Sequence, residues 1–410
     1  MKECHVLKEW RLKEWRSPPG STNRLHCRTG NSVSVLLKLH SWRKKMRSLD
    51  CILTAVAGQF DLQVEQSNLA GGGFSRAEVY RVLAAGGREF AFRKTPQHVA
   101  LPEERLRALH SLLAAVHRSG MVEIPVPYRP GAGPNGDSTQ NRPLRTGNAA
   151  AVHDPWIRFG TDIWQVEPWM PGSSIRGGEV RQKHQQSALH QLHAFHAAAA
   201  DHVSRGHHSV WFRKAVEPSP AVVRRLEITD ELWNGQLQIL RRKAAGDPDV
   251  GFRKAASAVF RVLDDRLPWL HRELTHLAAC SFPIQPVLRD VWRAHVLFTD
   301  ARVTGLIDLS AAATDHVAVD AARLLRSWFG TDSGQLLPAV SEFESRQSFS
   351  RTERQLLRVL DASSVLLSPV TWIRRRSDTV EQGSCPPEML LRFEEVAAVA
   401  EAFQPLPARQ

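Results

Sequence analysis

The sequence predicts an α+β fold in two lobes, a small antiparallel sheet with one helix followed by a larger and mainly helical lobe. Strand-like alternation and glycine turns dominate up to about residue 168, whereas helical periodicity dominates from residue 169 onward, apart from a strand-rich island at 286–309. The Pro and Gly residues at 168–172 suit a connector between the lobes. We therefore expect a basic extension at 1–45, an N-terminal lobe at 46–168 and a helical lobe at 169–410.

The N-terminal lobe can be predicted element by element. A glycine turn at 71–73 leads into alternating apolar residues, and Gly86-Gly87 predicts a tight turn before a returning strand at 89–94. Residues 103–116 predict a helix, because their apolar side chains recur on one face. Residues 129–155 are rich in Gly, Pro, Asn and Ser without periodicity, so we expect a surface insertion there.

In the helical lobe, periodicity predicts helices at 179–203, 228–244, 251–267 and 269–280. The first of these helices carries several histidines, but no nearby cysteine or acidic cluster completes a zinc site. We expect them to be surface residues, with His196 packed against the core.

Composition restricts the class of protein. Apolar residues make up 42% and charged residues 23% of the chain, values typical of a soluble globular protein. No run approaches the roughly 20 apolar residues that span a bilayer, and the N-terminus lacks the apolar core of a secretory signal. The five cysteines are scattered and form no C-x-x-C pair. We expect a cytoplasmic protein without a membrane partner.

The basic charge is concentrated at one end of the chain. Residues 1–49 contain 12 Lys and Arg against 3 Glu, so this segment supplies +9 of the net charge of +12. The remaining chain is nearly balanced, which argues against nucleic acid as the main partner. A nucleic-acid-associated protein working through this arm is one alternative, and it predicts a salt-dependent affinity that disappears on deleting residues 1–45.

Two acids stand at the ends of short apolar runs in the strand-rich island. Asp290 precedes a turn and a strand, and Asp308 ends that strand. Phosphoryl transfer needs one group to orient and deprotonate the attacking hydroxyl, and one or two metal ligands to neutralise the phosphate oxygens. Carboxylates at these positions, held on a rigid hairpin at 286–309, would supply both.

Together these blocks resemble the aminoglycoside phosphotransferase family, which shares the protein-kinase-like fold, over about residues 69–328. The resemblance implies that Asp290 is the catalytic-loop aspartate, with Arg289 directly before it. Because Trp292 follows Asp290 by only two residues, we expect this side chain to line the acceptor pocket. Asp308 and His295 occupy the two metal-binding positions. Asp320 matches a helical aspartate that braces the catalytic loop.

The resemblance also implies a nucleotide site. Arg93 or Lys94 takes the place of the strand lysine that contacts the phosphates, and strand alternation favours Arg93 because Ala91 would then lie under the adenine. Glu103 or Glu104 is the candidate ion-pair partner in the following helix. The remaining candidates are the phosphate-covering loop, Gly72, Gly73, Phe74 and Ser75, and the hinge residues Glu167, Trp169 and Met170.

These matches imply an ATP-dependent (or other NTP-dependent) phosphotransferase that uses Mg²⁺ or Mn²⁺ and acts on a hydroxyl of a small molecule. Three departures from the family pattern stand out: Leu288 replaces the usual His, His295 the usual Asn, and Arg93 the usual Lys. Magnesium prefers oxygen ligands, so His295 is an unusual choice. The alternative is a pseudokinase that binds nucleotide with little or no transfer.

Overall fold

The computed structural model describes residues 49–72, 77–131, 154–378 and 385–407. The predicted extension at 1–45, most of the insertion at 129–155, and Gly73, Phe74 and Ser75 of the phosphate-covering loop lie outside these ranges. The chain divides into two compact units, Met1–Ile52 and Leu53–Gln410, and every element from β1 onward belongs to the second.

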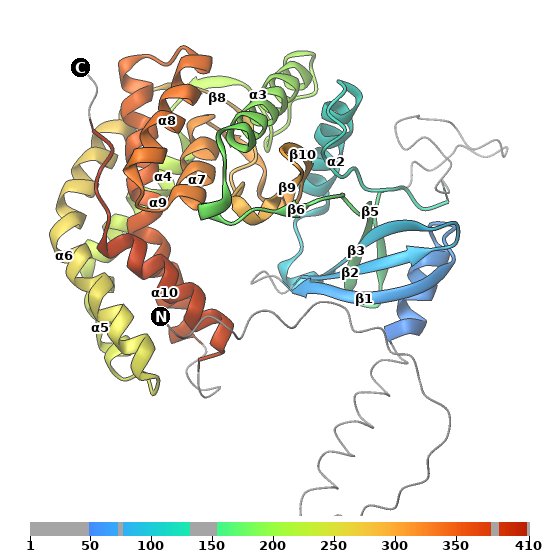
Figure 1. The fold of residues 1–410 in the computed structure, drawn as a ribbon, viewed down its shortest axis with the longest axis horizontal. Helices are drawn as coiled ribbons and strands as arrows, with labels where there is room; N and C mark the ends of the chain where they lie inside the picture. Colours follow the sequence, from blue (N-terminus) through green and yellow to red (C-terminus); the bar gives the residue numbers. More distant parts are fainter. Residues whose placement is uncertain (1–48, 73–76, 132–153, 379–384, 408–410) are drawn as a thin grey trace, which may run out of the picture. The chain divides into compact units, whose positions relative to one another are not determined.

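The first part of this unit is a five-stranded antiparallel sheet with the strand order β1-β2-β3-β5-β4 (Figure 1). Gly86 and Gly87 form the predicted turn between β2 and β3 with φ values of 86° and 76°, which glycine adopts without a Cβ clash. The strands are β1 (Val64–Gly72), β2 (Glu78–Ala84), β3 (Arg88–Pro96), β4 (Ile157–Phe159) and β5 (Asp162–Pro168).

Alternation along β3 decides which side chains face the rest of the molecule. Phe90 and Phe92 are buried on one face, and Arg93 lies on the other. The register of β3 with β5 pairs Arg93 with Gln165 and Ala91 with Glu167, so these four side chains share a face.

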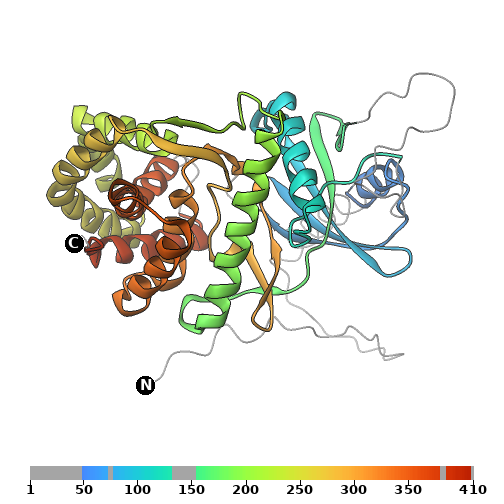
Figure 2. The ribbon, with the colours of Figure 1, turned by 90° about the horizontal axis from the view of Figure 1, so that it is seen from above.

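Helix α2 (Glu103–Arg118) packs on that face, as its apolar stripe predicts. It also lies beside α3 (Gln182–Ser204) of the helical part, as Figure 2 shows. The inner side chains of α2 from Leu109 to Val116 therefore belong to one hydrophobic core that continues through the C-terminal helices, whereas Leu106 packs with Trp156 and Ile163. The stripe residues Leu106, Leu109, Leu112, Leu113 and Val116 are all buried.

The predicted connector after β5 is held against a hairpin of the helical part. Strand β6 (Ser173–Ser174) pairs with β9 (Val296–Thr299), and the hydroxyl of Thr304 donates to the carbonyl of Pro171 at 2.7 Å. A side chain at Gly172 would not fit, because a Cβ there would lie 2.6 Å from the carbonyl oxygen of Phe298.

The second part of the unit is mainly helical, with two small three-stranded sheets, β10-β9-β6 and β11-β8-β7. Its helices are α3, α4 (Pro220–Glu231), α5 (Leu237–Ala245), α6 (Val250–Ala278), α7 (Ala318–Phe329), α8 (Ser333–Gln347), α9 (Arg351–Ser377) and α10 (Pro387–Glu401). The remaining strands are β7 (Ala215–Glu217), β8 (Phe282–Val287), β10 (Arg302–Leu306) and β11 (Ala313–Asp315).

Two helix boundaries differ from the prediction. The helices expected at 251–267 and 269–280 are one helix, α6, which continues through Pro268 because Leu267 and Leu270 on either side are buried in the core. Conversely, the helix expected at 228–244 is interrupted at Gly235, whose φ of 106° separates α4 from α5.

Among the described helices, α9 alone is long and apolar enough to cross a membrane, but 78% of its apolar window is buried inside the protein. It contacts α4, α5, α6, α7 and α10. Its composition is therefore explained by its position as the central helix of this part.

Candidate active site

Each of the two loops that carry the candidate acids contains a residue in the left-handed backbone conformation. Asp308 follows β10 with a φ of 58°, and Arg289, immediately before Asp290, has a φ of 64°. Residues other than glycine adopt this region at a cost of about 1 kcal/mol or more, and such positions gather at functional sites. The surrounding hydrogen bonds must therefore hold both loops in place.

Asp320, the first acidic residue of α7, holds the loop that carries Asp290. Its carboxylate is completely buried and accepts the backbone N–H groups of Leu288 at 2.9 Å and Arg289 at 2.6 Å. A third donor is Nε2 of His196, at 2.8 Å. The geometry confirms the expected bracing role of Asp320 and the buried position of His196.

His295 connects the same loop to the β9–β10 hairpin. Its Nδ1 lies 2.7 Å from the carbonyl oxygen of Asp290, which can only accept, so Nδ1 carries the proton. Its Nε2 then accepts the indole N–H of Trp292 at 2.9 Å. Both ring nitrogens are used, and no lone pair remains for a cation, so the geometry argues against the expected metal-ligand role of His295.

Asp308 is reached from the N-terminal sheet by Arg93. The guanidinium Nη1 lies 3.0 Å from Oδ1 of Asp308, whereas Lys94 points to the other face of β3 and contacts Glu78 and Asp162. The geometry therefore agrees with the choice of Arg93 over Lys94. Burial opposes the charge of Arg93, but Glu167 and Asp308 outweigh this and raise its pKa.

The expected pairing of Glu104 with this strand base is not found. Glu104 is exposed and forms no ion pair with any described residue, because it lies in the first turn of α2 and points away from the sheet. Its neighbour Glu103 pairs with Arg107 and Arg158 at the surface.

The acid beside Arg93 is instead Glu167 of β5. Burial raises the pKa of its carboxyl group, and the charge of Arg93 partly offsets this effect. The sequence suggested Glu167 only as a hinge residue. Its place next to Arg93 follows from the strand register, which a single sequence does not reveal.

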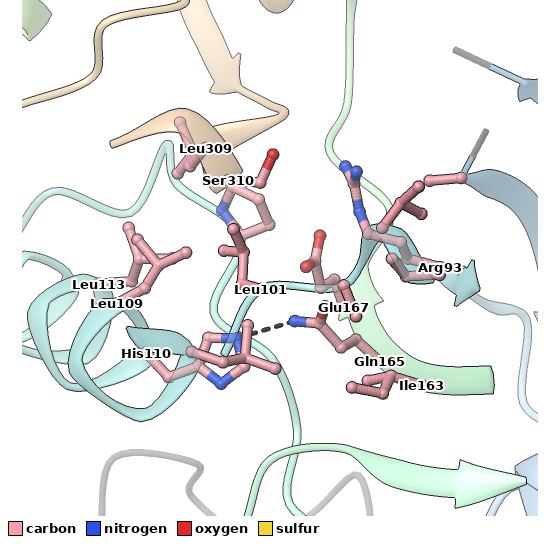
Figure 3. A pocket seen from close by; sticks show the side chains of 16 residues that line it. Arg93, Leu101, Leu109, His110, Leu113, Ile163, Gln165, Glu167, Leu309 and Ser310 are labelled. Atoms are coloured by element: carbon pink, nitrogen blue, oxygen red, sulfur yellow. Dashed lines mark hydrogen bonds between the residues drawn. The ribbon is translucent and has the colours of Figure 1, made fainter. Parts of the chain in front are cut away.

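A pocket of about 110 Å³ lies behind Arg93 and Glu167, between the sheet, α2 and the residues after Asp308 (Figure 3). Its floor carries a buried hydrogen bond of 2.7 Å between His110 and Gln165. Burial lowers the pKa of His110 to about 3, so the ring is neutral.

The hinge candidates lie where β5 leaves the sheet. The N–H of Trp169 donates to the carbonyl of Glu89 at 3.1 Å, and its ring lies 5.0 Å from the guanidinium of Arg81. The next residue, Met170, is buried against Gly305, and its N–H has no partner within the described residues. Gly72 ends β1 at the edge of the described sheet.

Arg323 is a residue of the site that sequence reasoning missed. It forms an ion pair with the carboxylate of Asp290. It follows Asp320 by three positions in α7, so both side chains lie on the same helix face, and this spacing is the signal that could have revealed it. Trp292 lies under the guanidinium of Arg392, with 4.6 Å between the guanidinium carbon and the ring centroid.

A divalent cation would depend on Asp308. Within the described residues, no group of three or more His, Cys, Asp or Glu side chains is arranged to hold a metal. Asp308 offers a carboxylate with about a third of its side chain exposed (36%), a hard oxygen donor of the kind Mg²⁺ prefers. The residues thus fit a cation whose remaining ligands come from phosphate and water.

The structure combines an antiparallel sheet with one helix, a linker, and a helical part that presents two acids at a hairpin. This combination defines the kinase-like class of phosphotransferases. A sequence model of the phosphotransferase enzyme family matches residues 68–357. The chain belongs to this family.

Solved structures agree on the fold. An aminoglycoside phosphotransferase from Alicyclobacillus acidocaldarius aligns over 85% of this chain and 92% of its own, with 16% identity and a TM-score of 0.51. An amicoumacin kinase aligns over 87% and 96%, with 11% identity and a TM-score of 0.53. A spectinomycin phosphotransferase aligns over 87% and 98%, with 13% identity and a TM-score of 0.50. No curated protein matches the sequence.

Proposed function

We propose that this protein transfers the γ-phosphoryl group of ATP, or of another NTP, to a hydroxyl group of a small molecule. The observation that carries the proposal is the position of His295 between the two acidic loops, with Nδ1 at 2.7 Å from the carbonyl oxygen of Asp290 and Nε2 at 3.7 Å from Oδ2 of Asp308. Arg93 reaches Asp308 from the N-terminal sheet. The amicoumacin kinase binds AMP-PNP and Ca²⁺, and the spectinomycin phosphotransferase binds ADP, which supports a nucleotide and a divalent cation as reactants.

Different residues of the site act on the acceptor and on the nucleotide. Asp290 orients the acceptor hydroxyl and receives its proton, while Arg93 contacts the phosphates. Asp308 would hold Mg²⁺ or Mn²⁺, which supplies charge neutralisation at the phosphate oxygens when bound. The unpartnered N–H of Met170 would hydrogen-bond the adenine, and the loop of Gly72, Gly73, Phe74 and Ser75 would cover the phosphates.

An ATP-consumption screen over hydroxyl-bearing compounds, with Mg²⁺ and with Mn²⁺, tests this function. We expect turnover with at least one compound and a loss of about 10²-fold or more in Asp290→Asn, the range for removal of a general base. Nucleotide affinity should stay close to that of the wild type. The matched control is Asp300→Asn, the same change at an exposed turn of the same hairpin, which should keep full activity.

The alternative, a nucleotide-binding protein without transfer, draws on one observation. His295 stands where the family has a metal-binding Asn and uses both ring nitrogens within the loop. Tight binding of ATP without turnover in the same screen would favour this alternative. Turnover that survives unchanged in Asp290→Asn would contradict the assigned role of Asp290.

A further inference from the structure

Four arginines, which we call the arginine cluster, come from α2, α4, α7 and the loop that carries Asp290, and they interact electrostatically with one another. Arg323 of α7 pairs with Asp290, and Arg289 precedes it in the chain. Arg105 of α2 donates to the carbonyl of Ala312 at 3.4 Å. The strand pairing of Ala313 with Val287 places Ala312 beside this loop. The fourth member, Arg225 of α4, interacts electrostatically with Arg289 and Arg323.

Three of these four side chains lack an acidic partner. No carboxylate among the described residues forms an ion pair with Arg105, Arg225 or Arg289. Arg225 donates only to neutral groups, the carbonyl of Leu360 at 3.2 Å and the hydroxyl of Ser364 at 2.9 Å. Its pKa falls to about 10 because of burial and the neighbouring arginines.

The acids near the cluster do not balance its charge. Asp290 is matched by Arg323, and the buried Asp315 faces Arg225 and Arg289 while accepting the hydroxyl of Ser219 at 2.6 Å. The next carboxylate, Asp361, is paired with Arg326. Four guanidinium groups therefore face two carboxylates, and the cluster keeps a surplus of positive charge.

Like charges held close together repel one another, so such a cluster lowers the stability of the fold unless an anion offsets it. Guanidinium groups bind carboxylate and phosphate groups in a bidentate manner. The cluster is accessible at Arg323, because 41% of this side chain and 37% of the Asp290 side chain are exposed, whereas Arg225 is largely buried. The observations therefore favour an anionic ligand at the position from which a hydroxyl would reach Asp290.

We propose that the acceptor of this phosphotransferase carries a carboxylate or phosphate group in addition to its reacting hydroxyl, and that the arginine cluster binds that anionic group. This inference rests on the proposed function. Arg323 forms an ion pair with the carboxylate of Asp290, the group that would receive the proton. An anionic acceptor would give Arg323 another negatively charged partner and leave Asp290 free to accept the proton.

The transfer step balances without a further reactant. The acceptor oxygen forms a bond to the γ-phosphorus while the bond from that phosphorus to the bridging oxygen of ADP breaks. The hydroxyl proton passes to Asp290, and ADP leaves with the electron pair of the broken bond. The anionic group of the acceptor stays on the arginine cluster and takes no part in bond formation.

Four compounds with one polyhydroxyl skeleton test the charge preference: glucose, glucose 6-phosphate, gluconate and glucosamine. Binding is measured by calorimetry with the protein saturated by AMP-PNP and Mg²⁺, which keeps the probes out of the phosphate site, and turnover is measured separately with ATP. We expect the phosphate or the carboxylate compound to bind at least tenfold more tightly than glucose, and glucosamine to bind no better than glucose.

The variants Arg289→Ala and Arg323→Gln should each weaken binding of the anionic compound by about tenfold or more, the loss of one charge-assisted contact. The matched control is Arg224→Ala, which removes the exposed neighbour of Arg225 in α4, paired with Glu227 at 2.9 Å. It should bind as the wild type does. Circular dichroism of each variant checks that the fold is retained. If Arg323→Gln misfolds, the binding measured for Arg289→Ala alone tests the inference.

The outcomes separate the inference from the proposed function. Anion binding that depends on Arg289, without any turnover, would support the arginine cluster as an anion site and count against the transferase. Preferential binding or turnover of glucosamine, or absence of binding by both anionic compounds, would overturn the inference. Equal losses in Arg224→Ala and Arg289→Ala would overturn it as well, because the effect would then be a general one of surface charge.

Discussion

His110 lies in α2 with 6% of its surface exposed, and its ring forms a hydrogen bond with Gln165. Burial lowers its pKa from 6.5 to about 3. In the unfolded chain the ring takes up a proton below about pH 6.5, whereas in the folded protein it stays neutral until about pH 3. Folding stability from this group is therefore fully present above pH 6.5 and is lost as the pH falls toward 3.

This residue gives a prediction about pH. The free energy of unfolding of the wild type, measured relative to that of His110→Gln, should decrease by about 2 kcal/mol between pH 7 and pH 5, at about 1.4 kcal/mol per pH unit below 6.5. Urea denaturation at several pH values measures it. The control is His193→Gln in α3, the same change at an exposed ring, measured over the same pH values. Parallel curves for His110→Gln and wild type would contradict the prediction.

Sequence reasoning at single residues gave the correct facing of side chains where local spacing determines it. Alternation along β3 separates Arg93 from Lys94, and in the structure Arg93 contacts Asp308 whereas Lys94 contacts Glu78. It failed where the partner comes from another element. Glu167 rather than Glu104 lies beside Arg93, because a register between β3 and β5 decides the pairing.

At the scale of elements, the linker depends on the absence of a side chain at residue 172. Gly172 has a φ of 96°, and a Cβ there would lie 2.5 Å from Oγ1 of Thr304 and 2.6 Å from the carbonyl oxygen of Phe298. Gly172→Ala should lower the free energy of unfolding by about 2 to 4 kcal/mol, from backbone strain plus overpacking. Thermal and urea denaturation measure this change.

The control for that variant is Gly178→Ala a few residues later. A Cβ at Gly178 would meet no atom within 4 Å, and its backbone is not left-handed. This variant should stay within about 0.5 kcal/mol of the wild type, as surface changes usually do. Equal stability losses in the two variants would show that close packing between the linker and the hairpin is not the cause.

Element boundaries were predicted least well where Pro or Gly interrupts a helical pattern. Pro268 suggested an end of a helix, yet α6 runs from Val250 to Ala278 because buried leucines on both sides stabilise it. Gly235 was expected inside a helix and instead separates α4 from α5. Packing with distant segments outweighs local propensity in the first case, and backbone freedom decides the second.

At the scale of the whole molecule, buried ion pairs join the central helix α9 to its neighbours. Arg326 of α7 contacts both oxygens of Asp361, with Nε at 2.7 Å from Oδ1. Asp361→Asn should lower the free energy of unfolding by about 3 to 5 kcal/mol, because the guanidinium is left buried without its charge partner. The measurement is urea denaturation at neutral pH.

An exposed pair of the same chemistry provides the comparison. Arg241 and Asp264 form an ion pair of 2.7 Å at the surface, where water screens the charges. Asp264→Asn should cost less than about 1 kcal/mol. A cost for Asp361→Asn no larger than that for Asp264→Asn would mean that the buried pair does not stabilise the packing of α9.

The sequence by itself determined the order of strands and helices, the apolar stripe of α2, and the two acids that end short runs around the hairpin. Each of these depends on neighbours within a few residues along the chain, and periodicity and turn chemistry express such relations directly. It also determined the family resemblance, which the match over residues 68–357 confirms.

Only the tertiary structure decided which charges meet. The electrostatic interaction of Glu167 with Arg93, the ion pair of Arg93 with Asp308 and the ion pair of Arg323 with Asp290 join segments far apart in the sequence. Electrostatic and hydrogen-bond energies depend on distance and burial, and a single sequence specifies neither until the chain has folded.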